Sequence, residues 1–283
     1  PGVASGVCII RSFTYLVLSL GLVLLVAPVP ALDVPFVEFS ANTTYGPAPL
    51  AVAFTDESLD AGGRAGFFGD EAYKVPWLLV NASPGWIARG HHSSVALPDG
   101  SITLMGGWGG WYWRNDTWRS TDTGATWTEV NESPGWQGKI GLSSVVLPDG
   151  SIVLTGGDTP AGESNDTWRS TDHGNVWTRQ SAHAGWTARE NHATAALPDG
   201  SIVLTGGFFT DDGSRWNDTW RSTDQGITWT RMNGSSGWPA RFGHAMVALP
   251  DGSIVLMGGV ASTEMNDTWR SVDRGATWVR VNA

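Results

Sequence analysis

The chain has 283 residues, with 17 Lys or Arg against 27 Asp or Glu, and therefore a net charge of −10. An acidic chain without a basic run lacks the electrostatic footprint of a nucleic-acid-binding protein and is a poor ligand for an anionic membrane. Its 37 Gly, 17 Trp and low charged fraction of 16% favour an all-β structure over a helical bundle. The single Cys8 excludes an intramolecular disulfide and a multi-Cys zinc site. We therefore expect neither a metal nor a cofactor.

Residues 1–31 have the features of a secretory signal peptide. Arg11 precedes an apolar run at residues 15–26, and small residues and prolines follow at 27–31. A basic start, an apolar run of about a dozen residues and small residues at the cleavage site are typical of export. We predict cleavage after Ala31 and a protein that is secreted or displayed at the cell surface. The alternative is an uncleaved anchor, in which case only this segment would contact a membrane.

Residues 32–70 form a separate segment. The stretches 36–42 and 46–56 resemble the opening strands of a PKD-type immunoglobulin-like module, and Phe-Phe-Gly-Asp at 67–70 resembles a motif of that family with shifted positions. The remainder of such a module is missing. We expect a partial module that does not close a sandwich of about seven strands.

Residues 71–82 contain an isolated copy of a strand that recurs later in the chain. The stretch 75–81 aligns with 125–131, and Trp77 lies 50 positions before Trp127. We therefore predict the outer strand of a blade whose first three strands are absent.

Residues 83–283 consist of four copies of one repeat, at 83–132, 133–182, 183–234 and 235–283. Each copy has a Gly-Trp pair, a Pro-Asp-Gly-Ser-Ile stretch that runs into Gly-Gly, an Asn-Asp-Thr-Trp stretch and a final Trp. Twelve of the 17 Trp occupy these repeated places, so architecture explains them before chemistry does. In the third copy, short β-branched or alternating stretches at 193–197, 201–205, 218–222 and 228–232 are separated by turn residues. Four antiparallel strands in about 50 residues indicate a β-propeller blade.

These residues resemble two known repeat types. The apolar strand ending in Gly-Gly, followed by Asn-Asp-Thr-Trp and a final Trp, resembles the kelch repeat, as does Arg-x-x-His before the first strand. The second copy departs from this pattern, with Lys139 and Leu142 in place of Arg and His. Ser-x-Asp-x-Gly-x-Thr-Trp resembles the Asp-box of sialidase-type propellers. Its structural Asp residues are Asp122, Asp172, Asp224 and Asp273. We expect these carboxylates to accept backbone N–H groups across a turn.

The sequence leaves the number of blades open. Either four blades close and the isolated strand covers an edge, or the propeller is completed by a longer chain or by a homo-oligomer. Kelch-like propellers are usually larger, and exposed sheet edges are costly, which favours the larger assembly.

Three enzyme or metal hypotheses follow from the resemblance. Galactose oxidase chemistry needs a Tyr–Cys cross-link, which Cys8 in the signal segment cannot supply. A sialidase-like hydrolase would need an arginine cluster from Arg89, Arg189 and Arg241 and a Tyr112–Glu129 pair. A metal site would need the equivalent histidines to converge near the propeller axis; these are His92, His192 and His244. The repetition of the Arg and His residues favours a structural role for both sets.

The loops between the second and third strands vary among the copies, and the first is rich in aromatic residues. Aromatic side chains suit carbohydrate or protein contact, although they could instead pack against the next blade. The candidate ligand-binding residues are Trp108, Trp111, Tyr112, Trp113, Arg114, Phe208, Phe209, Arg89, Arg189 and Arg241. We expect a non-enzymatic recognition protein whose partner is an unidentified protein or glycan. The alternatives are the sialidase-like hydrolase and a structural component of a surface layer.

Overall fold

The computed structural model describes residues 4–8, 37–41, 54–56 and 79–281 and divides the chain into two units, Pro1–Leu78 and Leu79–Ala283. In the first unit β1 (Ala4–Cys8), β2 (Val37–Ala41) and β3 (Phe54–Asp56) form an antiparallel sheet in that order. β2 lies within the expected stretch 36–42, and β3 occupies the last three residues of the stretch 46–56. The apolar run, the cleavage site, the motif at 67–70 and Trp77 lie outside the described residues, so the signal peptide and the PKD-like module remain predictions.

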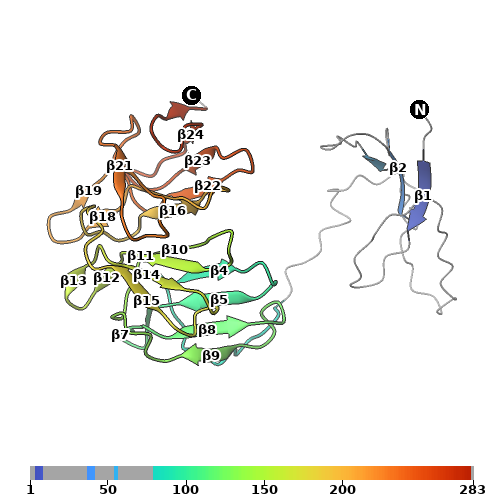
Figure 1. Cartoon of the computed structure of the whole chain (residues 1–283). Helices are drawn as coiled ribbons and strands as arrows, with labels where there is room; N and C mark the ends of the chain where they lie inside the picture. Colours follow the sequence, from blue (N-terminus) through green and yellow to red (C-terminus); the bar gives the residue numbers. More distant parts are fainter. Residues whose placement is uncertain (1–3, 9–36, 42–53, 57–78, 282–283) are drawn as a thin grey trace. The chain divides into compact units, whose positions relative to one another are not determined.

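In the second unit four antiparallel sheets are arranged as a four-bladed β-propeller, and no helix occurs in the described residues (Figure 1). Blade 1 contains β4 (Ser93–Ala96), β5 (Ile102–Met105), β8 (Thr117–Ser120) and β9 (Thr128–Asn131). Blade 2 contains β10 (Ser143–Val146), β11 (Ile152–Thr155), β14 (Thr167–Ser170) and β15 (Thr178–Ser181). Blade 3 contains β16 (Ala193–Ala196), β17 (Ile202–Thr205), β20 (Thr219–Ser222) and β21 (Thr230–Asn233). Blade 4 contains β22 (Ala245–Ala248), β23 (Ile254–Met257), β24 (Thr268–Ser271) and β25 (Val279–Arg280).

The turn residues of the repeat set the strand ends. In blade 3, Asp199 Oδ1 accepts hydrogen bonds from the backbone N–H and the hydroxyl of Ser201, at 3.0 and 2.5 Å. Gly200, with φ +81°, adopts the left-handed conformation that this tight turn requires. The turn therefore returns the chain directly from β16 into the apolar strand β17.

The turn between the third and fourth strands depends on a carboxylate. In blade 1, Asp122 Oδ1 accepts the backbone N–H of Thr126 at 2.8 Å, and Oδ2 accepts its hydroxyl at 2.6 Å. These hydrogen bonds to the charged form lower the pKa of Asp122 to about 2. The corresponding backbone bonds are made by Asp172, Asp224 and Asp273. The carboxylate thus reinforces the turn beside a backbone bond of 3.2 Å from the Ala125 N–H to the Asp122 carbonyl.

Tryptophan pairs form the core of each blade. In blade 3 the rings of Trp186 and Trp229 meet edge to face, with centroids 6.1 Å apart and an interplanar angle of 85°. The same pair recurs in the other blades as Trp86–Trp127, Trp136–Trp177 and Trp238–Trp278. Such contacts add stabilisation beyond the burial of ring area.

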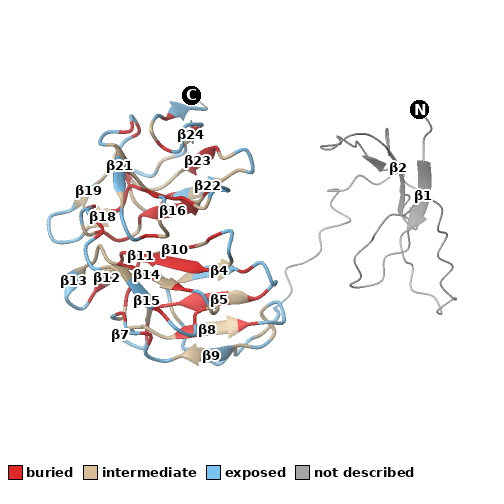
Figure 2. Ribbon diagram, viewed as in Figure 1, coloured by how far each residue is buried: buried red, intermediate tan, exposed pale blue. Residues whose placement is uncertain are grey.

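We call the contact between consecutive blades a seam. Ser143 Oγ and Thr194 Oγ1 lie 2.6 Å apart across the seam between blades 2 and 3, and Thr155 Oγ1 lies 2.8 Å from His192 Nε2. At the seam between blades 1 and 2 apolar residues, Met105 and Leu142, belong to one buried cluster. All residues of β11 and β17 are buried, whereas β4 and β22 consist of partly buried and exposed residues (Figure 2).

Residues at the start of the second unit occupy the place of an outer strand. Asn81 Nδ2 donates to the carbonyl of Ala125 at 2.7 Å. Two outer-strand residues, Asn131 and Asn233, make the same bond to the last turn of the following blade. Asn81 therefore lies where the outer strand of a blade preceding blade 1 would end.

Candidate functional site

The connections between the second and third strands of blades 1 to 3 fold as small hairpins. They pair β6 (Trp108–Gly109) with β7 (Tyr112–Trp113), β12 (Asp158–Thr159) with β13 (Gly162–Glu163), and β18 (Phe208–Phe209) with β19 (Ser214–Arg215). In a four-stranded antiparallel sheet the turn after the second strand lies opposite the other two turns. The three hairpins therefore share one end of the propeller, which we call the hairpin end; the opposite end is the turn end.

The aromatic hairpin of blade 1 has a packed base and an exposed tip. Trp108 and Trp113 meet edge to face at 4.7 Å and are partly buried. By contrast, 84% of Trp111 and 68% of Tyr112 are exposed. Packing against the scaffold therefore explains two of the aromatic residues and leaves two large rings in solvent.

Arg114 stabilises this hairpin from below. Its Nε donates to the carbonyl of Gly109 at 2.9 Å, and its guanidinium lies 6.0 Å from the ring of Tyr112. On the other side, Gly138 of blade 2 lies so close to Trp113 that a Cβ would clash with its backbone. These contacts fix the base of the hairpin.

Side chains connect the hairpins laterally. Trp113 Nε1 donates to Asp158 Oδ2 of blade 2 at 3.3 Å. The backbone N–H of Thr210 in blade 3 donates to Glu163 Oε1 of blade 2 at 2.6 Å. The hairpin ends of blades 1, 2 and 3 therefore form one continuous surface.

Carboxyl groups gather where the second hairpin meets blade 3. Glu190 is 9% exposed and forms a backbone bridge with Phe208. Burial, and then the nearby charges of Asp158 and Glu163, raise the pKa of Glu190 to about 7. Burial also raises the pKa of Asp158. Near neutral pH the Glu190 carboxyl can therefore donate as well as accept a hydrogen bond.

The two phenylalanines of the third hairpin contribute mainly to packing. Phe208 contacts Phe242 of blade 4 with ring centroids 4.9 Å apart, and the Arg215 guanidinium lies over both rings. Phe209 meets Trp216 edge to face at 6.4 Å. Both phenylalanines are only partly exposed.

The three repeated arginines are used inside their own blades. Arg189 is fully buried and donates to both carboxylate oxygens of Asp218, at 2.7 and 3.0 Å, and to the carbonyls of Gly206 and Thr187. The same ion pair recurs as Arg89–Asp116 and Arg241–Asp267. Because these bonds occupy the guanidinium groups, we leave the three arginines out of the site that we propose.

The sialidase-type pair is not brought together by any hydrogen bond in the described residues. Tyr112 lies at the exposed hairpin tip, whereas Glu129 lies in the outer strand β9, opposite Trp118. Burial is the main cause that raises the pKa of Glu129.

The equivalent histidines stabilise seams. His192 and His244 bond to threonines of the preceding blade, and burial lowers the pKa of each to about 3. Among residues 79–281 and the described strands of the first unit, no group of three or more His, Cys, Asp or Glu side chains could hold a metal ion.

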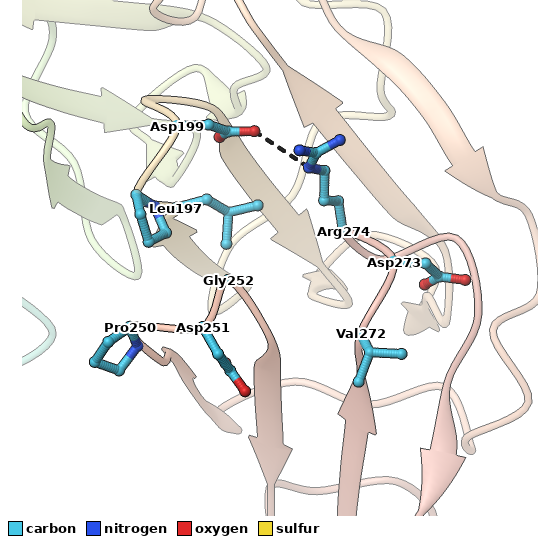
Figure 3. Close-up of a pocket in the computed structure, with 9 residues that line it drawn as sticks. Leu197, Asp199, Pro250, Asp251, Gly252, Val272, Asp273 and Arg274 are labelled. Atoms are coloured by element: carbon cyan, nitrogen blue, oxygen red, sulfur yellow. Dashed lines mark ion pairs between the residues drawn. The ribbon is translucent and has the colours of Figure 1, made fainter. Parts of the chain in front are cut away.

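The turn end contains two open hollows. One, of about 430 Å³, lies between blades 3 and 4 and is lined by Leu197, Pro250, Asp251 and Val272, and beside it Arg274 pairs with Asp199 at 3.2 Å (Figure 3). The other, of about 480 Å³, is lined by the residues at the ends of the four inner strands, mostly Leu, Pro and Ala. Neither has the exposed rings and buried carboxyls that occur together at the hairpin end.

Comparisons with protein-family models and with curated proteins returned no match. No helix in the part of the chain that the structure describes is long and apolar enough to cross a membrane.

Sequence reasoning missed the carboxyl groups of this surface. Asp158 and Glu163 lie in a variable loop, and Glu190 occupies a repeat position that holds Gly90, Ile140 and Phe242 in the other copies. A comparison of the copies for single unusual charges would have identified Glu190. Its proximity to Asp158 follows only from the packing of two blades.

Proposed function

We propose that this chain is a non-enzymatic recognition protein, secreted or at the cell surface, and that the hairpin end of blades 1 to 3 binds a carbohydrate. The observation that carries the proposal is the exposure of Trp111 and Tyr112 on a hairpin whose base is fixed. An exposed ring on a rigid support offers a flat apolar face at low entropic cost. The apolar face of a sugar ring fits such a surface.

The neighbouring carboxyl groups supply the polar half of the site. Asp158 is in contact with Trp113, Glu163 lies opposite Asp158 in the same hairpin, and Glu190 of blade 3 lies close to both carboxylates. Carboxyl oxygens accept hydrogen bonds from sugar hydroxyls, and a protonated Glu190 can also donate one. A few polar groups beside aromatic rings are the usual composition of a small-ligand site.

A glycan-array screen of the full chain tests this proposal. The variant carries Trp111→Ala and Tyr112→Ala, and the matched control carries Val272→Ala, an exposed apolar residue of the turn end. We expect a defined glycan set whose binding falls at least about tenfold in the hairpin variant, as for a central aromatic contact, and is unchanged in the control. Absence of glycan binding by a folded sample would contradict carbohydrate recognition and favour a protein partner.

A further inference from the structure

The three seams within the propeller follow one rule. Each blade has a trailing face toward the next blade and a leading face toward the previous one. The inner strand is the first strand of each blade (β4, β10, β16 and β22). Because side chains alternate along a strand, its first and third residues belong to the trailing face and its second and fourth residues to the leading face. Ser93 therefore meets Ser144, and Ser143 meets Thr194, each pair at 2.6 Å.

Backbone bonds join each seam in the same direction. The backbone N–H of Gly141 donates to the carbonyl of His91 at 3.1 Å. In the next two seams the N–H of Asn191 donates to the carbonyl of Gly141 at 2.7 Å, and the N–H of Gly243 donates to the carbonyl of Asn191 at 2.8 Å. All four residues have positive φ angles between 52° and 63°. Among residues 79–281 no backbone hydrogen bond joins blade 4 to blade 1. The series therefore ends with a free His91 N–H on one face and a free Gly243 carbonyl on the other.

Burial identifies the same two faces as open. On the trailing face of blade 4, Ala245 and Val247 are exposed, whereas the equivalent Ala193 and Ala195 of blade 3 are buried. On the leading face of blade 1, Ser94 and Ala96 are exposed. A Cβ at Gly124 of blade 1 would meet nothing within 4 Å. At the equivalent Gly174, Gly226 and Gly275 a Cβ would contact the preceding blade.

At two positions of each seam, the facing residues have like polarity. The first position joins the last residue of a blade's second strand to the residue just before the next inner strand, and the second joins the first residue of one inner strand to the second residue of the next. At the first, the pairs are Met105 with Leu142, Thr155 with His192, and Thr205 with His244. At the second, Ser93 bonds to Ser144 and Ser143 bonds to Thr194, and the equivalent residues of the third seam are Ala193 and Met246. Direct contact of blade 4 with blade 1 would oppose Met257 to His92 and Ala245 to Ser94. Both pairs place an apolar residue against a polar one, and each leaves a buried polar group without its partner.

We infer that the two open faces bind further blades of the same repeat, and that these blades are not the chain's own blades 4 and 1, either within one molecule or between two copies. The blade before blade 1 presents Thr to His92 and a hydroxyl side chain to Ser94. The blade after blade 4 presents apolar residues to Met257 and Ala245. Asn81, in the place of an outer strand, already makes the contact expected of the preceding blade.

A variant of the intact chain in which the trailing face of blade 4 is made polar tests the pairing of residues of like polarity. Ala245→Ser with Met257→Thr gives blade 4 the trailing face that His92 and Ser94 require. We expect this variant to associate head to tail at least about tenfold more tightly than the native chain in sedimentation velocity, since two hydrogen bonds replace unpaired groups. The addition of Ser94→Arg should remove the gain.

Two outcomes would overturn the inference. One is a native chain that associates through this seam as tightly as the variant, which would make a second copy the occupant. The other is a variant that gains nothing, or whose gain survives Ser94→Arg. If the variant does not fold, the reciprocal conversion of His92→Leu with Ser94→Met makes the leading face apolar and predicts the same gain.

Discussion

Blades 2 and 3 have the same strand order and register, yet different side chains stabilise them. Blade 3 buries Arg189, which makes two bonds to Asp218 and two to backbone carbonyls. In blade 2, Lys139 makes a single bond of 2.6 Å to Asp166, and the hydroxyl of Ser164 donates a second one to the same oxygen. The fold therefore requires a buried cation opposite the Asp of Asn-Asp-Thr-Trp, whereas the bidentate geometry is optional.

The seams differ in the same way. Thr155 and His192 form a polar pair between blades 2 and 3, while Met105 and Leu142 form an apolar pair between blades 1 and 2. Either pair fills the position if both partners change together. This coupling explains how the second repeat, with Lys139 and Leu142, departs from the other three and still packs as a blade.

The largest expected effect comes from removing the buried guanidinium. Arg189→Ala leaves Asp218 buried without its cation, so we expect a loss of about 3–5 kcal/mol in the free energy of unfolding. Lys139→Ala is the matched variant in blade 2, and its loss should be smaller because Ser164 still bonds to Asp166. Urea unfolding of both variants measures the difference. Equal losses would show that the two blades use the cation in the same way.

The second-largest loss of stability is expected from breaking the polar pair Thr155–His192 between blades 2 and 3. Thr155→Val leaves His192 Nε2 unpaired, and we expect a loss of about 1–3 kcal/mol in the free energy of unfolding. The double change of Thr155→Met with His192→Leu copies the pair of the other seam and should recover most of that loss. A double-mutant cycle by urea unfolding measures this coupling. Additive losses would refute the idea that the pairs are interchangeable.

The sequence shows both residues of each seam pair, such as Thr155 and His192, but it does not show that they are in contact. The repeat landmarks predicted the four-stranded blades: the observed strands of blade 3 begin or end within one or two residues of the expected ones. The sequence predicted only that the loops between the second and third strands vary among the copies, whereas in blades 1 to 3 they fold as hairpins. The exposure of Trp111 but not of Trp113 depends on the neighbouring blade. Contacts between non-equivalent positions of different repeats, such as Asp158 and Glu190, have no periodic signal.

Acid should weaken the polar seams selectively. Burial lowers the pKa of His192 from 6.5 to about 3, so the unfolded state binds its proton first. The stabilisation is therefore complete above pH 6.5 and is lost as the pH falls toward 3. Thermal unfolding of the Thr155→Met and His192→Leu double variant should show a shallower decline in Tm over this range. His244 still titrates in that variant, so a residual slope is expected, and an unchanged slope would exclude His192 as a source of acid sensitivity.

The smallest expected effect is a gain. Lys139→Arg would give blade 2 the cation of blade 3, with a second bond to Asp166 and a donor for the Gly156 carbonyl, which corresponds to Gly206 in blade 3. Burial lowers the pKa of Lys139 because the ammonium loses its hydration, and this desolvation cost is smaller for the more weakly hydrated guanidinium. We expect a gain of about 0.5–1.5 kcal/mol in the free energy of unfolding, the usual net worth of one hydrogen bond. Asp166 also bonds to Ser164, so the Ser164→Ala background should enlarge the gain. A loss of stability in both backgrounds would show that blade 2 has closed around the smaller ammonium group.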